Sequence, residues 1–294
     1  MPVLNSRRGN KLARQVNSAW FRYAQAWFPR SYGQSPHPLT VVIPLAEKDI
    51  GIAGACVAAA RRHLRHPIAR IVVPGQPSAR IADFCRKEGL EYRDETSVLD
   101  RRVLDFEWRA AGQNRRGWIR QQFLKLTVAE WLEGERFLVL DADTLLARDL
   151  AFMEGERQIL WRADDLVEDY YAFTEAVIGP VTRRNYSCVS HCMLLQRGVL
   201  DALKVHIESR AGTDWIVAML NAIQTGTLAG MSEYELYAHF LMRERPDAFR
   251  LRYWYNRKAD LDGPRAIETS LRRHARFNFL SDHNQKRADP GGGS

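Results

Sequence analysis

Two short, nearly continuous apolar runs constrain the fold of this chain more than any other feature of its sequence. They are Leu39–Leu45 and Phe137–Leu140. Strands that are apolar at successive positions are typical of a sheet covered on both faces. A helix is expected after the first run, up to about Leu64, and a further strand over Ile68–Val73. This strand, helix, strand order predicts an α/β fold with a doubly wound, mostly parallel sheet flanked by helices.

Other elements can be placed from their end signals. Ser78 is expected to cap a helix that Gly89 closes. Further helices are expected over Trp118–Leu132 and from Ser232 to about Arg243, and a short late strand over Phe277–Leu280. A chain of 294 residues with this pattern can bury a substantial core.

The N-terminal segment differs from the rest of the chain. Lys11–Phe28 predicts an amphipathic helix, because its apolar residues recur at helical spacing. Such a helix would either pack on the domain or lie on an anionic membrane surface, where Trp and Phe beside Arg are favourable. We expect residues 1–35 to form this basic helix and a Pro- and Gly-containing linker, residues 36–287 to form one domain, and residues 288–294 to be a tail that ends in an expression linker.

The net charge of +8 lies at the two ends of the chain. The first 46 residues contain basic side chains and no acidic ones, and residues 264–294 are also basic. Basic ends with aromatics are compatible with a nucleic-acid-binding or membrane-binding protein. The body between them is near neutral and lacks a basic stripe interleaved with aromatics, so nucleic acid is not the expected partner. If the N-terminal helix lies on an anionic membrane rather than on the domain, the contact is expected through residues 7–30.

Neither a targeting signal nor a membrane span is predicted. The N-terminus lacks a continuous apolar stretch with a cleavage site, and the weakly polar run Ile50–Ala60 is too short to cross a bilayer. The four cysteines have no framework spacing, which fits a reducing compartment. We expect a cytoplasmic protein, with peripheral association at the inner face of the inner membrane as the open alternative.

An Asp-x-Asp motif follows the second apolar run. Asp141 and Asp143 come directly after a predicted buried strand, at the edge where open α/β sheets bind ligands. In extended chain their side chains point the same way, and Ala142 between them adds little bulk. Two carboxylates facing one point suit Mn²⁺ or Mg²⁺ with positions left for phosphate oxygens. The other copy of the motif, Asp260–Asp262, precedes Gly-Pro and predicts a solvated loop.

With the motif in place, several blocks in order resemble the GT-A-fold nucleotide-diphospho-sugar glycosyltransferases, and more closely a bacterial family known only as a domain of unknown function. The blocks within residues 39–287 are Val42–Leu45 with Asp49, Gly117–Leu126, Phe137–Asp143, Val189–Met193 and Ser232–Tyr237. The resemblance implies a metal-dependent, hexosyltransferase-like enzyme. It would move a sugar from a nucleoside diphosphate, with UDP-sugar the first expectation, to a hydroxyl of an envelope glycan or glycolipid.

On the donor side, the resemblance implies that Pro44 and Asp49 contact the nucleotide, together with Asp141–Asp143. Gln121 and Lys125 are four residues apart on one helix face. A lysine near a diphosphate stabilises charge that develops on the leaving group. The alternatives stay open: Asp49 could cap a helix or lie on the surface, and Lys125 could be a solvated helix residue.

On the acceptor side, Glu233 is the expected general base if the enzyme inverts, and Glu235 is the second candidate. Ser232 and Glu235 form a Ser-x-x-Glu capping box, which would also give Glu235 a structural role. Both acids could instead simply favour the helix N-terminus. His191 and Tyr237 are expected to line the acceptor pocket.

The third metal ligand is expected to be His283, which follows the late strand, although a surface histidine in a polar tail is the alternative. Cys188, His191 and Cys192 do not predict a zinc site. In a strand the two cysteines would share one face and the histidine would point to the other, and structural zinc sites use four ligands.

A nucleotidyltransferase is the closest enzymatic alternative, because it shares this type of sheet. Such enzymes hold a triphosphate with a Gly-rich, basic loop after the first strand. The segment Glu47–Gly51 is a poor substitute for that loop.

Overall fold

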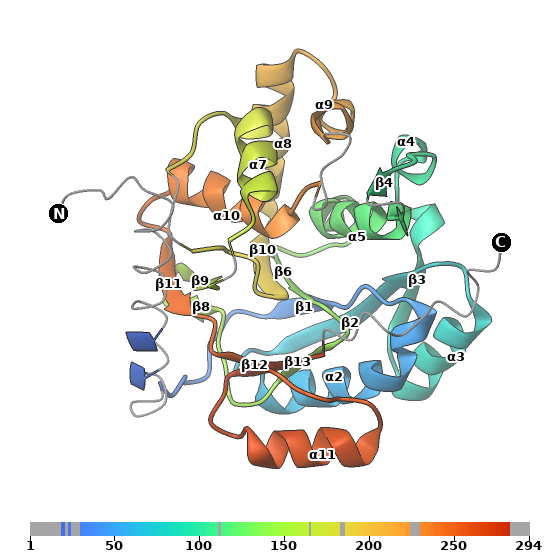
Figure 1. Ribbon diagram of the computed structural model, residues 1–294, viewed down its shortest axis with the longest axis vertical. Helices are drawn as coiled ribbons and strands as arrows, with labels where there is room; N and C mark the ends of the chain where they lie inside the picture. The colour runs from blue at the N-terminus through green and yellow to red at the C-terminus, as the bar shows by residue number, and fades with distance from the viewer. Residues whose placement is uncertain are drawn as a thin grey trace.

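The computed structural model describes residues 19–20, 23–24, 30–110, 113–164, 166–182, 186–223 and 230–282. A five-stranded sheet at its centre has the order β10-β6-β1-β2-β3 (Figure 1). Its strands are β1 (Leu39–Val42), β2 (Ile68–Gly75), β3 (Glu91–Asp94), β6 (Arg136–Leu140) and β10 (Cys192–Gln196). All neighbours pair in parallel except β10, which runs antiparallel to β6. The expected doubly wound, mostly parallel sheet is confirmed.

Helices cover both faces of this sheet (Figure 1). One face carries α5 (Arg116–Leu126), α7 (Glu168–Ile178), α8 (Arg197–Ala211) and α10 (Glu233–Glu244), and the other carries α2 (Ile50–His63) and α3 (Ala79–Glu88). Along β6, Phe137 and Val139 pack with the first set of helices, and Leu138 and Leu140 with the second. Burial on both faces, at about 25 cal/mol per Å² of apolar surface, explains why the strand is apolar at successive positions.

The expected helices are present with small differences. The Ser78 hydroxyl accepts from the Ile81 N–H and caps α3, which ends at Gly89 in the left-handed conformation. The helix expected over 118–132 is two helices, α5 and α6 (Val128–Trp131), which meet at Thr127. The Thr127 hydroxyl donates back to the Phe123 carbonyl at 2.9 Å, a bond that bends helices. Further helical segments are η1 (Glu47–Asp49), η2 (Glu95–Ser97), α4 (Arg101–Leu104), α9 (Trp215–Ala222) and α11 (Pro264–Arg273).

Three smaller sheets are present in the described part of the chain. They are β11 (Phe249–Tyr253) with β9 (Arg157–Arg162) and β8 (Met153–Glu154); β12 (Asn256–Lys258) with β13 (Phe279–Ser281) and β7 (Thr144–Leu146); and β4 (Arg109–Ala110) with β5 (Gln113–Asn114). In the second of these, β7 begins directly after Asp143, and the Asp282 N–H donates to the Asp143 carbonyl at 3.0 Å. These contacts place β13 and Asp282 beside the Asp-x-Asp motif.

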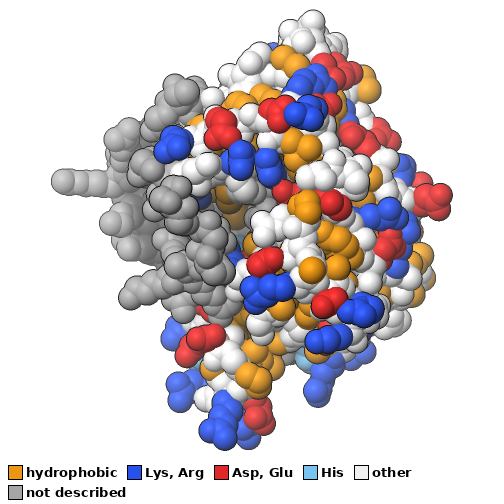
Figure 2. Space-filling model, turned by 90° about the vertical axis from the view of Figure 1, so that its right-hand side faces the viewer, with side chains coloured by type: hydrophobic (Ala, Val, Ile, Leu, Met, Phe, Trp, Pro, Cys, Tyr) orange, Lys and Arg blue, Asp and Glu red, His pale blue; other side chains and the backbone are white. Residues whose placement is uncertain are grey.

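Two sequence predictions fall largely or wholly outside the described residues. Of the helix expected over 11–28, only residues 19–20 and 23–24 are described, and these are helical; His283 is not described. Among the described helices, none is long and apolar enough to cross a membrane. The face of the molecule at the right of Figure 1, which includes α3 and α4, mixes acidic and basic side chains (Figure 2). That face therefore offers no uniform basic surface for nucleic acid.

Candidate metal and donor site

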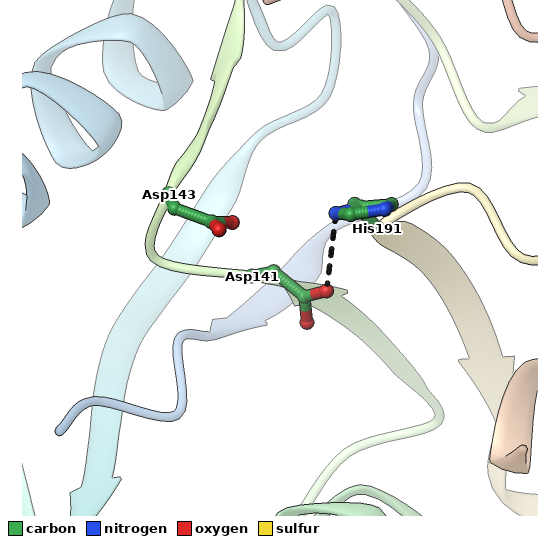
Figure 3. Close-up of side chains that lie close together, drawn as sticks. All are labelled: Asp141, Asp143 and His191. Carbon is green, nitrogen blue, oxygen red and sulfur yellow. Dashed lines mark ion pairs between the residues drawn. The ribbon is translucent and has the colours of Figure 1, made fainter. Parts of the chain in front are cut away.

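Two carboxylates and one imidazole converge at the carboxyl end of β6. Asp141 and Asp143 follow β6, and His191 comes directly before β10 (Figure 3). One possible ligand atom from each side chain lies within 4.8 Å of the other two. Two oxygen donors and one nitrogen donor suit Mn²⁺ and related divalent cations, and three protein ligands leave positions for other oxygens. These residues therefore fit a divalent cation.

The antiparallel edge strand brings His191 to the two aspartates. Cys192 pairs with Leu140 in the sheet, and the Asp141 N–H donates to the His191 carbonyl at 2.9 Å. His191 has a φ of 56°, and no other non-glycine residue in the described part of the chain has a positive φ. Its ring stacks on Trp254 with centroids 5.0 Å apart and planes inclined by 14°. Sparsely populated backbone conformations of this kind cluster at functional sites.

A buried lysine engages one oxygen of Asp141. Lys125 is 3% exposed, and its Nζ donates to Asp141 Oδ1 at 2.7 Å and to Glu233 Oε1 at 2.6 Å. The Tyr234 hydroxyl donates to the same Asp141 oxygen at 3.1 Å. The other oxygen, Oδ2, lies 3.6 Å from His191 Nδ1. Asp141 thus has one oxygen held by the protein and one directed at the other side chains of the candidate metal site.

These contacts shift the pKa values of the three charged groups. Burial alone would lower the pKa of Lys125, but the carboxylates of Asp141 and Glu233 raise it above its usual range. Burial alone would raise the pKa of Asp141, but Lys125 and then His191 lower it. Burial raises the pKa of Glu233 against the opposing effect of Lys125. Lys125 and Asp141 are therefore both charged at neutral pH.

The pKa of the Asp143 carboxyl group is also shifted. Burial, with the negative charges of Asp141 and Asp49, raises its pKa to about 7. Three acidic side chains from two loops are thus close enough to repel one another, and a divalent cation would relieve that repulsion. Asp49 belongs to η1, just beyond β1. The structure therefore brings Asp49 to the motif, and its contact with a nucleotide stays a prediction.

The other residues predicted on the donor side have different surroundings. Pro44 is buried two residues after the end of β1, and Ala142 is 6% exposed and packs into the core. Gln121 is half-buried on α5. Lys125 is not the solvated residue that the sequence left possible, because its ammonium is buried between the half-buried carboxylate of Asp141 and the buried carboxylate of Glu233. In this arrangement it contacts Asp141 rather than an open phosphate position.

The first turn of α10 lies deeper than expected. Glu233 is 1% exposed and ion-paired with Lys125, so it is not at the mouth of a site where an acceptor hydroxyl could meet it. Ser232 caps α10 by accepting from the Glu235 N–H at 3.4 Å. The Glu235 side chain does not complete the predicted capping box; its Oε1 accepts from the Cys188 N–H at 3.0 Å instead. Both corrections arise because α10 packs against the core rather than over an opening.

The two residues expected in the acceptor pocket are also placed differently. Tyr237 is fully buried, and its hydroxyl donates to Gln158 Oε1 at 2.9 Å and accepts from the Gln196 N–H at 3.0 Å. It is a core residue with a satisfied hydroxyl. His191 lies with Asp141 and Asp143 in the candidate metal cluster, a placement that the sequence did not predict. The sequence signal that could have indicated this placement is that His191 comes immediately before a strand, β10, that pairs with β6.

The comparison with protein families covers most of this architecture. Residues 58–275 match the family of unknown function DUF6492. The chain belongs to this family. The match includes Asp141, Asp143 and His191 as well as the first turn of α10, so the DUF6492 region contains every side chain of the candidate metal site. No match to a curated protein was found for the chain.

Several solved structures are similar to this DUF6492 chain at low identity. They include the galactosyltransferase LgtC in complex with donor and acceptor sugar analogues (12% identity, TM-score 0.42, covering 84% of this chain and 88% of that one). Others are the glycosyltransferase GlyE of Streptococcus pneumoniae TIGR4 (12%, 0.39, 84% and 55%) and a glycosyltransferase involved in glycosylation of the major capsid of PBCV-1 (13%, 0.35, 86% and 95%). At these scores the similarity says nothing about activity, which has to be inferred from the site itself.

Proposed function

We propose that this DUF6492 protein is a GT-A-type glycosyltransferase that uses Mn²⁺ or Mg²⁺ and a nucleoside diphosphate sugar. The observation that carries the proposal is the convergence of Asp141, Asp143 and His191 at the carboxyl end of β6. Open α/β sheets bind their ligands at this edge. Two carboxylates and an imidazole suit a cation that also binds diphosphate oxygens.

The protein's own residues would prepare this site before a donor arrives. Asp141, Asp143 and His191 would hold the cation, with His283 as a further candidate ligand. When bound, the cation offsets the negative charge that develops on a departing diphosphate. Lys125 keeps Asp141 ionised and fixes its carboxylate, so that the ligand is oriented without reorganisation. Asp49 and Pro44, after β1, are the proposed nucleotide contacts.

The proposed acceptor is a hydroxyl of an envelope glycan or glycolipid, and the proposed donor is a UDP-sugar. Glu233 and Glu235 are not proposed as general bases, because both are 1% exposed and each has a buried partner. Glu233 instead balances the charge of Lys125. An inverting reaction would need a general base other than these two residues. A retaining reaction would not need such a base for the acceptor hydroxyl.

A nucleotidyltransferase is less well supported by the same geometry. Such an enzyme needs cationic or N–H groups for a triphosphate after the first strand. In this chain η1 follows β1 and contains Lys48 between two acidic residues, Glu47 and Asp49. Asp49 adds negative charge near Asp143. That environment favours a bound cation over a bare polyphosphate.

Thermal unfolding with a panel of nucleotides tests the proposal. In the presence of Mn²⁺, a nucleoside diphosphate whose free concentration is about 100 times its Kd stabilises the fold by about 2.7 kcal/mol. We expect UDP with Mn²⁺ to raise the Tm by several degrees and UDP with EDTA to leave it unchanged. A larger shift with a nucleoside triphosphate than with any diphosphate would favour the nucleotidyltransferase, and no shift with any nucleotide would contradict both.

A further inference from the structure

His191 is the last residue of a segment, residues 186–191, which we call the strap. The rest of the strap holds the backbone of His191. Near its start, Ser187 and Ala163 exchange two backbone hydrogen bonds of 3.0 and 2.7 Å. At its end, the Asp141 N–H donates to the His191 carbonyl at 2.9 Å. Ser187, Cys188 and Ser190 of the strap are buried, so their polar backbone groups need partners within the protein. The position of the imidazole therefore depends on how the strap is held between these two points.

Glu235 binds the middle of the strap. Its Oε1 accepts from the Cys188 N–H at 3.0 Å, and both residues are buried. Its Oε2 lies 3.3 Å from Nε2 of His239, one turn further along α10. The His239 ring packs edge-on against Tyr171 of α7, whose hydroxyl donates to the Tyr186 carbonyl at 2.9 Å. The helices α7 and α10 thus hold the start and the middle of the strap together.

The first turn of α10 therefore supports both halves of the candidate metal site. Tyr234 donates to Asp141, while its neighbour Glu235 holds the strap that ends in His191. His191 has a φ of 56°, and a non-glycine residue leaves that region unless its surroundings enforce it. Without an acceptor for the Cys188 N–H, the strap could relax and carry the imidazole away from the carboxylates.

We propose that Glu235 is a positioning residue that sets the geometry of His191 for metal binding. The inference rests on the proposed function, because it requires His191 to be a ligand. Groups that orient metal ligands from outside the coordination sphere typically change metal affinity by about tenfold to 100-fold when they are removed. Glu235 is suited to this role because its carboxylate reaches the strap from a rigid helix.

The test is a Mn²⁺ titration followed by the electron paramagnetic resonance signal of free Mn²⁺, with full-length protein. Glu235→Ala should weaken Mn²⁺ binding by about tenfold to 100-fold. Glu235→Gln should stay close to wild type, because its amide oxygen can still accept from the Cys188 N–H. Gln158→Met is the matched control: it removes a fully buried group that donates to the Leu194 carbonyl at 2.6 Å, so it should lower the Tm without changing Mn²⁺ affinity.

A folded Glu235→Ala protein with wild-type Mn²⁺ affinity overturns the inference. The inference also fails if Glu235→Gln and Gln158→Met lose as much Mn²⁺ affinity as Glu235→Ala does. If Glu235→Ala does not fold, Glu235→Asp replaces it. Its shorter side chain keeps the charge but cannot reach Cys188, so unchanged affinity in that variant also overturns the inference. Failure of the proposed function looks different: the wild type would then bind no Mn²⁺, or would bind it equally well after Asp143→Ala.

Discussion

Lys125 Nζ lies 2.7 Å from Asp141 Oδ1, and this contact joins helix α5 to the loop that follows β6. The same ammonium lies 2.6 Å from Glu233 Oε1, so one buried cation balances the half-buried carboxylate of Asp141 and the buried carboxylate of Glu233. A buried charge is costly when its partner is removed. The Lys125 contact therefore links the stability of the fold to the orientation of the first aspartate of the motif.

Lys125→Met should destabilise the protein by about 3–5 kcal/mol, because it leaves Asp141 and Glu233 without their cation. Urea unfolding of the metal-free protein measures this change. Adding Glu233→Gln should recover part of the loss, since it removes one of the two stranded charges. Arg272→Met, which breaks an exposed ion pair with Glu268, should leave the midpoint near wild type. A Lys125→Met protein as stable as wild type would show that the ammonium does not balance these carboxylates.

Mn²⁺ affinity should depend on pH through Asp143. Burial, Asp141 and Asp49 raise the pKa of Asp143 to about 7, so below that pH a proton competes with the cation. The association constant should fall about tenfold per pH unit below 7 and level off above about 8. Because the folded pKa exceeds that of an unfolded carboxyl, this group also destabilises the metal-free fold at neutral pH, and the penalty declines as the pH falls.

Isothermal titration with Mn²⁺ across this pH range checks the prediction. Asp260→Asn, in the exposed second copy of the motif between β12 and α11, should keep the same profile. Affinity that is independent of pH between about 6 and 8 would mean that Asp143 is not protonated in competition with the metal.

The third protein ligand can be identified by comparing two histidines. His191→Ala should lower Mn²⁺ affinity by at least about tenfold, because it removes a nitrogen donor that lies beside both carboxylates. His274→Ala, at the end of α11, is the control and should bind as wild type. If His283→Ala shows the larger loss and His191→Ala none, the ligand set predicted from sequence is correct and His191 has another role.

Gly230→Ala should destabilise the protein more than Gly212→Ala. Both glycines have a positive φ, of 56° and 66°, so both substitutions introduce backbone strain of about 1 kcal/mol. An added Cβ meets open space at Gly212, but at Gly230 it would lie 2.8 Å from the ring of the buried Trp108. We expect a further cost of about 1–3 kcal/mol at Gly230, measured by urea unfolding. Equal midpoints for the two variants would contradict this packing.

The layered fold could be predicted because its signals are local. Continuous apolar strands require a sheet with two covered faces, and the end signals at Ser78 and Gly89 are properties of neighbouring residues. The same holds for Asp141 and Asp143, since their side chains follow directly from the end of β6. These predictions needed only the spacing of apolar residues along the chain and the residue types at the ends of its helices and strands.

The rest of the site depends on long-range contacts that no local pattern reports. His191 reaches the aspartates because β10 runs antiparallel to β6 and the residue adopts a positive φ. Glu233 and Glu235 looked like surface acids in a first helical turn, but α10 buries both against Lys125 and the strap. The wrong placement of Tyr237 has the same origin, since burial of α10 was not visible in its sequence.

Sugar release from a panel of UDP-, GDP- and CMP-sugars, measured with Mn²⁺ and with EDTA, tests the central proposal most directly. The proposal predicts that one nucleotide class is hydrolysed, that EDTA stops the reaction and that added Mn²⁺ restores it. Asp143→Ala should abolish turnover, whereas Asp262→Ala, in the solvated copy of the motif, should not. Equal turnover in EDTA, or in Asp143→Ala, would contradict a metal-dependent glycosyltransferase built on Asp141 and Asp143.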